Sequence, residues 1–177
     1  MDRPLLHDPA GTYNTLADRE GWHSICFGDL NFASAKLNAL LAIWREAAHD
    51  DAIPSRKALT PQKLRAYLSD IAIYERSTGL DGGERWRARV MGEKFTSIMG
   101  NYNGKFFDEA MPAKFLNRWY AAPNAVLAAR VPMRFVSRSE TAGKGFITGE
   151  YLVAPLIGDD RVLNTVLSAA EFGPTFG

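Results

Sequence analysis

The chain has 177 residues, of which 46% are hydrophobic and 11% aromatic, so it can form one domain with a sizeable core. Its net charge is +1 with both signs interspersed, so we expect neither nucleic acid nor a membrane as a partner. The one cysteine, Cys26, has no second thiol for a disulfide or a C-x-x-C motif. No apolar run approaches about eighteen residues and the N-terminus lacks an apolar h-region, so we predict no membrane span and no secretory signal, and with the single cysteine a cytoplasmic location.

The first 68 residues divide into an arm and a helical segment. Residues 1–30 contain scattered proline and glycine without periodicity, so we expect a loosely ordered N-terminal arm. Residues 31–68 are expected to hold an N-terminal helix and a short connecting helix. The first helix has an apolar stripe at helical spacing, and its main members are Leu37, Leu40, Leu41 and Trp44. The connecting helix is predicted over residues 60–68, with Thr60 as its N-cap.

Residues 69–177 are expected to form the core, which starts with a hairpin. Residues 70–76 are rich in β-branched and aromatic side chains and lead into a turn that contains Asp81-Gly82. The second arm, residues 85–91, alternates so that Trp86, Ala88 and Val90 share one face. This strand is therefore predicted to be half buried.

Three more strands follow a helical middle region. They are predicted over residues 131–139, 146–157 and 162–172, with hairpin loops at residues 142–145 and 158–160. Strands that are joined by such short turns pair antiparallel. The sequence therefore predicts an α+β fold in which a five-stranded antiparallel sheet carries helices on one face and is preceded by an amphipathic helix.

The middle region predicts short helical turns and then one longer helix. Glycine and asparagine interrupt the apolar residues between Phe95 and Phe107, so only short turns are expected there. The longer helix is predicted to be capped by Asp108, with Pro112 in its first turn. Pro123 lies inside this pattern and is expected to kink or split the helix, because proline lacks an N–H and clashes with the preceding turn.

The element order is accompanied by local motifs between Leu37 and Phe172. These are Leu41-Ala42-Ile43-Trp44-Arg45, Ile53-Pro54-Ser55-Arg56, Tyr67-Leu68, Arg87-Ala88-Arg89-Val90-Met91-Gly92, Phe95, Gly100, Gly104 and Phe107-Asp108. Together they resemble the PAS domain superfamily, and specifically a bacterial single-domain PAS-like family, a domain of unknown function. The resemblance implies a sensory module with a pocket against one sheet face and a tendency to dimerise. Such domains hold haem, flavin, small metabolites or nothing, so the fold leaves the ligand open.

Large flexible and aromatic side chains suggest where such a pocket would be lined. Apolar ligand sites use side chains of this kind. The candidates are Phe95, Ile98, Met99, Phe106, Phe107, Trp119, Tyr120, Met133 and Phe135. The alternative is that the same residues close-pack into a dry core.

Two other surfaces are candidates for contact with partners. The stripe of Leu37, Leu40, Leu41 and Trp44 is predicted either to meet its copy in a homodimer or to cover the outer sheet face. An arginine row, Arg85, Arg87 and Arg89, could contact an acidic partner. The alternative is a solvated face that is balanced by cross-strand glutamates.

The cofactor readings depend on where histidine and cysteine occur. Haem needs an axial ligand in the pocket region, but His7, His23 and His49 all precede the core. Covalent flavin photochemistry needs a cysteine in the pocket helix, whereas Cys26 lies in the arm. We therefore predict no cofactor and no metal site, while non-covalent flavin and other small molecules stay open.

The leading functional hypothesis is a non-enzymatic regulatory PAS protein that acts through a protein partner, with a small apolar ligand in its core pocket. A second hypothesis is a small cone-shaped α+β enzyme of the isomerase type, which would use a pocket carboxylate for proton transfer. Its candidate carboxylates are Asp70, Asp108 and Glu150. A third hypothesis is a ligand-free dimerisation module with a filled core.

Overall fold

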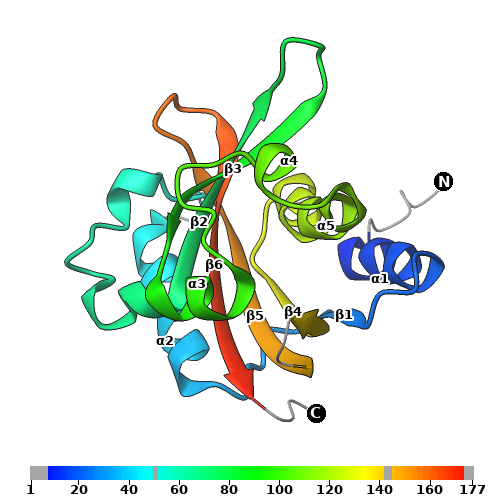
Figure 1. Ribbon diagram of the computed structural model, residues 1–177. Coiled ribbons are helices and arrows are strands. Elements are labelled where there is room, and N and C mark those ends of the chain that lie inside the picture. Colours follow the sequence, from blue (N-terminus) through cyan, green and yellow to red (C-terminus); the bar gives the residue numbers. More distant parts are fainter. Residues whose placement is uncertain (1–7, 50–51, 142–144, 174–177) are drawn as a thin grey trace, which may run out of the picture.

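The computed structural model describes residues 8–49, 52–141 and 145–173, in which one sheet lies between two sets of helices (Figure 1). The strand order is β1-β4-β5-β6-β2-β3, and each neighbouring pair is antiparallel. The bounds are β1 Ser24–Phe27, β2 Ile71–Thr78, β3 Glu84–Met91, β4 Met133–Thr141, β5 Gly145–Ile157 and β6 Leu163–Gly173. Every helix in the described ranges is too short or too polar to reach across a bilayer.

The five predicted strands and their antiparallel pairing are confirmed as β2 to β6. The predicted loop at residues 158–160 is observed as the turn between β5 and β6, whereas most of the loop at 142–145 lies outside the described residues. The sixth strand, β1, pairs with β4 at one edge of the sheet. The arm, from which β1 comes, contains more regular structure than the sequence predicted.

Alternate residues of the central strands point to two different hydrophobic clusters. In β5, Tyr151 and Val153 belong to the cluster on one face, and Leu152 and Ala154 belong to the cluster on the other. We call the first the inner face and the second the outer face. Because both faces are covered, successive residues of a central strand are buried, as in β6 from Asn164 to Ala170.

The alternation predicted for β3 is interrupted near its end. The pairing with β2 shifts between Ile73 and Tyr74, so that Ile73 faces Val90 while Tyr74 faces Ala88. One extra residue on β3 is thereby left unpaired, which is a β-bulge. Trp86 and Ala88 are fully buried as predicted, but Val90 is 36% exposed. The prediction that Val90 shares their buried face is therefore wrong.

The prediction of a loosely ordered arm is also wrong for the residues that the structure describes. Helix α1, Pro9–Arg19, begins at the N-cap Asp8, whose side chain accepts a hydrogen bond from the Gly11 backbone N–H at 3.0 Å. Tyr13 and Ala17 of this helix are buried. Figure 1 shows α1 beside α5, and the two helices are in contact.

Three helices cover the inner face: α3 Glu93–Met99, α4 Phe107–Ala110 and α5 Ala113–Ala129. Asp108 lies inside α4 instead of capping the long helix, because α5 starts only after Pro112. Pro123 does not split α5, which continues to Ala129, so this part of the expectation is corrected. The missing N–H of Pro123 leaves only one helical hydrogen bond unmade, and Pro123 itself is buried.

Helix α2, Ala35–Ala47, covers the outer face, one of the two positions that the sequence left open for it. Its stripe of Leu37, Leu40, Leu41 and Trp44 is at most 8% exposed within the chain. Trp44 also donates a hydrogen bond from Nε1 to the Pro155 carbonyl at 2.9 Å. These four side chains have almost no surface left for a second copy, so their assignment to a dimer interface is corrected.

The connecting segment after α2 is less regular than predicted. Instead of one α-helix over residues 60–68, it contains two short 3₁₀ helices, Arg56–Ala58 and Arg65–Asp70. The Thr60 hydroxyl accepts a hydrogen bond from the Lys63 backbone N–H, but only a turn follows it. Leu59 and Leu64 are buried against the outer-face cluster. This packing, and not a helical repeat of apolar residues, determines the course of the segment.

Candidate ligand-binding cavity

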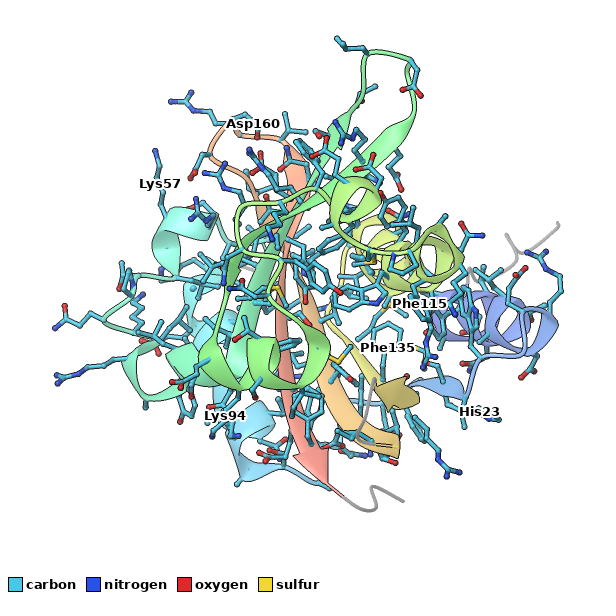
Figure 2. All side chains as sticks on the ribbon, in the orientation of Figure 1. His23, Lys57, Lys94, Phe115, Phe135 and Asp160 are labelled. Carbon is cyan, nitrogen blue, oxygen red and sulfur yellow. The ribbon has the colours of Figure 1, made fainter. Side chains whose placement is uncertain are left out.

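A cavity of about 110 Å³ lies between the inner face of the sheet and helices α1, α3 and α5. Its apolar wall consists of Phe95, Met99, Trp119, Ala122, Pro123, Phe135 and Val153. Its polar wall consists of Tyr13, Ser24, Tyr74, Arg118, Ser137, Tyr151 and Ser168. Figure 2 shows Phe135 in the interior below α5, whereas His23, Lys57, Lys94 and Asp160 lie at the periphery.

Four of the nine predicted pocket residues line this cavity: Phe95, Met99, Trp119 and Phe135. The other five lie around it without lining it. Phe107 and Met133 are buried in the same inner-face cluster, and Tyr120 packs against that cluster. The guanidinium carbon of Arg85 lies 3.9 Å from the centroid of the Phe106 ring. Ile98 is half-buried.

Sequence reasoning missed the contributions from the arm and from the sheet. Tyr13 of α1 and Ser24 of β1 belong to the segment that was expected to be loosely ordered. Tyr74, Tyr151 and Ser168 come from central strands, where alternation places them on the inner face. The Asp8-Pro9 pair, an N-cap followed by proline in the first turn, was the available signal for α1.

Hydrogen bonds tie α1 and α5 to the edge of the sheet at the cavity. The hydroxyl groups of Tyr13 and Ser24 are 2.8 Å apart and share a hydrogen bond. Arg118 of α5 donates from Nη2 to Ser137 Oγ at 2.5 Å and to the Arg138 carbonyl at 3.0 Å. The elements that border the cavity are therefore joined by hydrogen bonds as well as by packing.

The tyrosines of the cavity are held in their protonated form. Burial raises the pKa of Tyr74 and of Tyr151 far above the usual value, since the charged phenolate would lose its hydration. Burial also raises the pKa of Tyr13, although its hydrogen bond with Ser24 acts in the opposite direction. All three side chains thus present O–H groups at neutral pH.

None of the three carboxylates nominated for proton transfer lines the cavity, and each is held by cations. Asp70 lies 2.8 Å from Lys36 Nζ and 3.0 Å from Lys94 Nζ. Asp108 accepts two hydrogen bonds from Arg85, at 2.6 and 2.7 Å. Glu150 accepts from Arg134 Nε at 2.8 Å. The geometry therefore gives the isomerase hypothesis no carboxylate in the cavity.

The arginine row is paired with carboxylates of the same surface. Arg85 contacts Asp108 and Glu109, and Arg87 and Arg89 both contact Glu75, at 3.4 and 3.3 Å. This arrangement corresponds to the charge-balanced, solvated face that was the alternative to an acidic-partner surface.

The histidine and cysteine residues that bear on the cofactor hypotheses lie away from the cavity. His23 and His49 are exposed, and His7 lies outside the described residues. Cys26 is buried in β1, where desolvation and, to a smaller degree, the Asp8 carboxylate raise its pKa to about 12. Among the described residues, no group of three or more histidine, cysteine, aspartate or glutamate side chains could hold a metal ion. The cofactor hypotheses stay predictions.

Comparisons with known proteins identify a family for most of the chain. A family model described as a PAS domain matches residues 32–169. No curated protein matches the chain. A solved structure of an RNA-binding light-oxygen-voltage receptor is similar with a TM-score of 0.38 and 12% sequence identity. The similarity covers 84% of this chain, which spans 37% of that receptor.

Proposed function

Because this chain belongs to the PAS domain family, we propose that it is a non-enzymatic sensory module that binds a small ligand in its inner cavity and signals occupancy to a partner protein. The cavity is the observation that carries the proposal. It has an apolar wall and a polar wall, which is how small-molecule sites combine affinity with orientation. Its volume of about 110 Å³ approaches that of apolar protein cavities that bind one benzene ring, roughly 150 Å³.

The N-terminal segment supports the second part of the proposal. Tyr13 and Ser24 line the cavity but precede residues 32–169, which the PAS family model matches. Helix α1 contacts both β1 and α5, so a ligand in the cavity touches an element added at the edge of the family's domain. A change in occupancy therefore alters the contacts of α1, which is the surface that we propose a partner protein reads.

The proposal includes a cytoplasmic location. Its support is the single cysteine, which cannot form an internal disulfide and which is buried in β1.

Native mass spectrometry of the purified protein tests the ligand. We expect a mass above that of the denatured chain by the mass of one small molecule. Substitution Ala122→Leu places a larger side chain in the cavity wall and is expected to abolish the extra mass. The matched control Ala128→Leu lies on an exposed position of the same helix and is expected to retain it.

Two outcomes would contradict the proposal. A native protein without any bound molecule, which also gains no thermal stability from a panel of small aromatic and aliphatic compounds, would favour the ligand-free dimerisation module. A bound molecule that is retained equally by Ala122→Leu and Ala128→Leu would place the ligand elsewhere on the chain.

Hydrogen exchange tests the signal. Ligand binding is expected to slow amide exchange in α1, because α1 forms part of the cavity wall. If exchange in α1 is the same with and without ligand, the proposed route to a partner is wrong.

A further inference from the structure

Three hydroxyl groups of the cavity lining have no hydrogen-bond partner among the described residues: those of Tyr74, Tyr151 and Ser168. Tyr74 is 6% exposed and Ser168 is 4% exposed. No side chain in the described part of the chain buries a polar atom completely without a partner, so these hydroxyls face the open space that they line. A molecule that fills this space must hydrogen-bond these hydroxyls, because a polar group that becomes buried without a partner is costly.

The polar wall offers O–H and N–H donors to a bound molecule, and its hydroxyl oxygens can also accept. Tyr74 and Tyr151 are protonated, and their phenol groups are close enough to influence each other electrostatically. Arg118 lies in the same wall, where its guanidinium acts on Tyr13 and Tyr151 and presents only N–H donors. A ligand oxygen that accepts hydrogen bonds complements such a wall, whereas the positive charge of Arg118 opposes an ammonium group.

The apolar wall offers aromatic rings to the rest of the ligand. Phe135 packs edge-to-face on Tyr13 with ring centroids 4.9 Å apart, and Trp119 lies 6.2 Å from Tyr74. Rings in these orientations leave faces and edges that a further aromatic ring can contact favourably. The volume of about 110 Å³ limits the ligand to roughly one ring.

From these observations we propose that the ligand is a single-ring aromatic compound that carries one hydrogen-bond-accepting oxygen. Its ring packs between Phe135 and Trp119, and its oxygen accepts from Tyr74 and Tyr151. The inference rests on the proposed function, since it specifies the chemistry of the same cavity.

Calorimetric titration with phenol, toluene and benzylamine tests this ligand class. We expect phenol to bind about tenfold more tightly than toluene, because one hydrogen bond changes the affinity by about that factor. Benzylamine is expected to bind most weakly. Tyr74→Phe and Tyr151→Phe are each expected to weaken phenol binding by roughly five- to tenfold while leaving toluene binding unchanged. Tyr67→Phe, which alters a tyrosine packed on the outer-face cluster, is the matched control and is expected to change neither.

The outcomes separate this inference from the proposed function. If toluene binds as tightly as phenol and neither tyrosine substitution matters, the cavity binds ligands but the proposed ligand class is wrong. If benzylamine binds most tightly, the polar wall does not act as a set of donors. If no probe binds and the purified protein carries no small molecule, the proposed function itself is wrong.

Discussion

The two faces of the sheet are made by the same strands but are filled in different ways. On the outer face, aliphatic side chains of α2 and the strands are fully buried, among them Leu37, Leu156 and Leu167. On the inner face, aromatic rings and hydroxyl groups surround a cavity. One strand can therefore contribute to a close-packed core through half of its residues and to a ligand site through the other half.

The largest expected effect concerns the outer face and its buried ion pair. Glu150 is completely buried and accepts hydrogen bonds from Arg134 and from the backbone N–H groups of Ala33 and Ser34, each at 3.0 Å. Glu150→Ala leaves Arg134 without this partner in a buried position, so it is expected to lower the free energy of unfolding by about 3 to 5 kcal/mol. Denaturant titration measures the loss.

The control for this prediction is an exposed ion pair. Asp159→Ala removes the partner of Arg56, which lies 2.6 Å away on the surface, and is expected to cost about 0 to 1 kcal/mol. Equal losses in Glu150→Ala and Asp159→Ala would show that burial of the first pair has no energetic consequence.

Truncation on each face compares their packing directly. Leu156→Ala on the outer face is expected to cost about 2 to 5 kcal/mol, since it creates a new void in a close-packed cluster. Met99→Ala removes a side chain that already borders the cavity and is expected to cost less than half as much. Thermal or chemical unfolding of the two variants gives the comparison. Similar losses would mean that the inner face is packed as tightly as the outer one.

A charge cluster links helices from the two faces and makes stability depend on pH. Asp70 contacts Lys36 of α2 and Lys94 of α3. Burial by itself raises the pKa of Asp70, but the hydrogen bonds from both lysines and Ser69 outweigh it, so the pKa is lowered. A carboxyl group with a lowered folded pKa stabilises the fold above its unfolded pKa and loses this contribution as the pH falls through the folded pKa.

The variant Asp70→Asn reports this contribution. Its stability deficit relative to the natural chain is expected to be largest near neutral pH and to shrink below a pH of about 4, the range in which the unfolded carboxyl group becomes protonated. Melting temperatures between neutral and acidic pH measure the deficit. A deficit that is constant over this range would exclude the ion pairs as its cause.

The smallest expected effects concern the two edges of the sheet, which are closed in the same way. Asn14 accepts from the Cys26 backbone N–H at 2.7 Å and donates to the Cys26 carbonyl at 2.9 Å. Asn103 makes the same pair of bonds with Met91, at 2.6 and 3.1 Å. Each side chain thus occupies backbone groups that a further strand would otherwise pair with.

Asn14→Ala and Asn103→Ala are each expected to cost about 1 kcal/mol and to speed amide exchange at Cys26 and Met91, respectively. Exchange measured residue by residue provides the test, with each variant as the control for the other edge. If both amides remain protected in both variants, the asparagine side chains do not close the edges.

The core of the fold was predictable from local patterns, and part of the candidate site was too. Turn residues and alternation located β2 to β6, and the apolar stripe that begins at Leu37 located α2. Four of the predicted pocket residues line the cavity, because the prediction selected large aromatic and flexible side chains, which are the kind that apolar ligand sites use. The strand residues of the polar wall were not predicted, since a tyrosine in a buried strand has the same local pattern whether it faces a cavity or a packed core.

The sequence by itself determined which segments form β2 to β6 and that those joined by short turns pair antiparallel, because these features depend on turns and on alternation between neighbours in the chain. Only the tertiary structure decided that β1 pairs with β4, that α1 forms part of the cavity wall, and that α2 packs within its own chain. Each of these depends on contacts between segments that are distant in sequence, and their energies come from shape and burial, which no local pattern encodes.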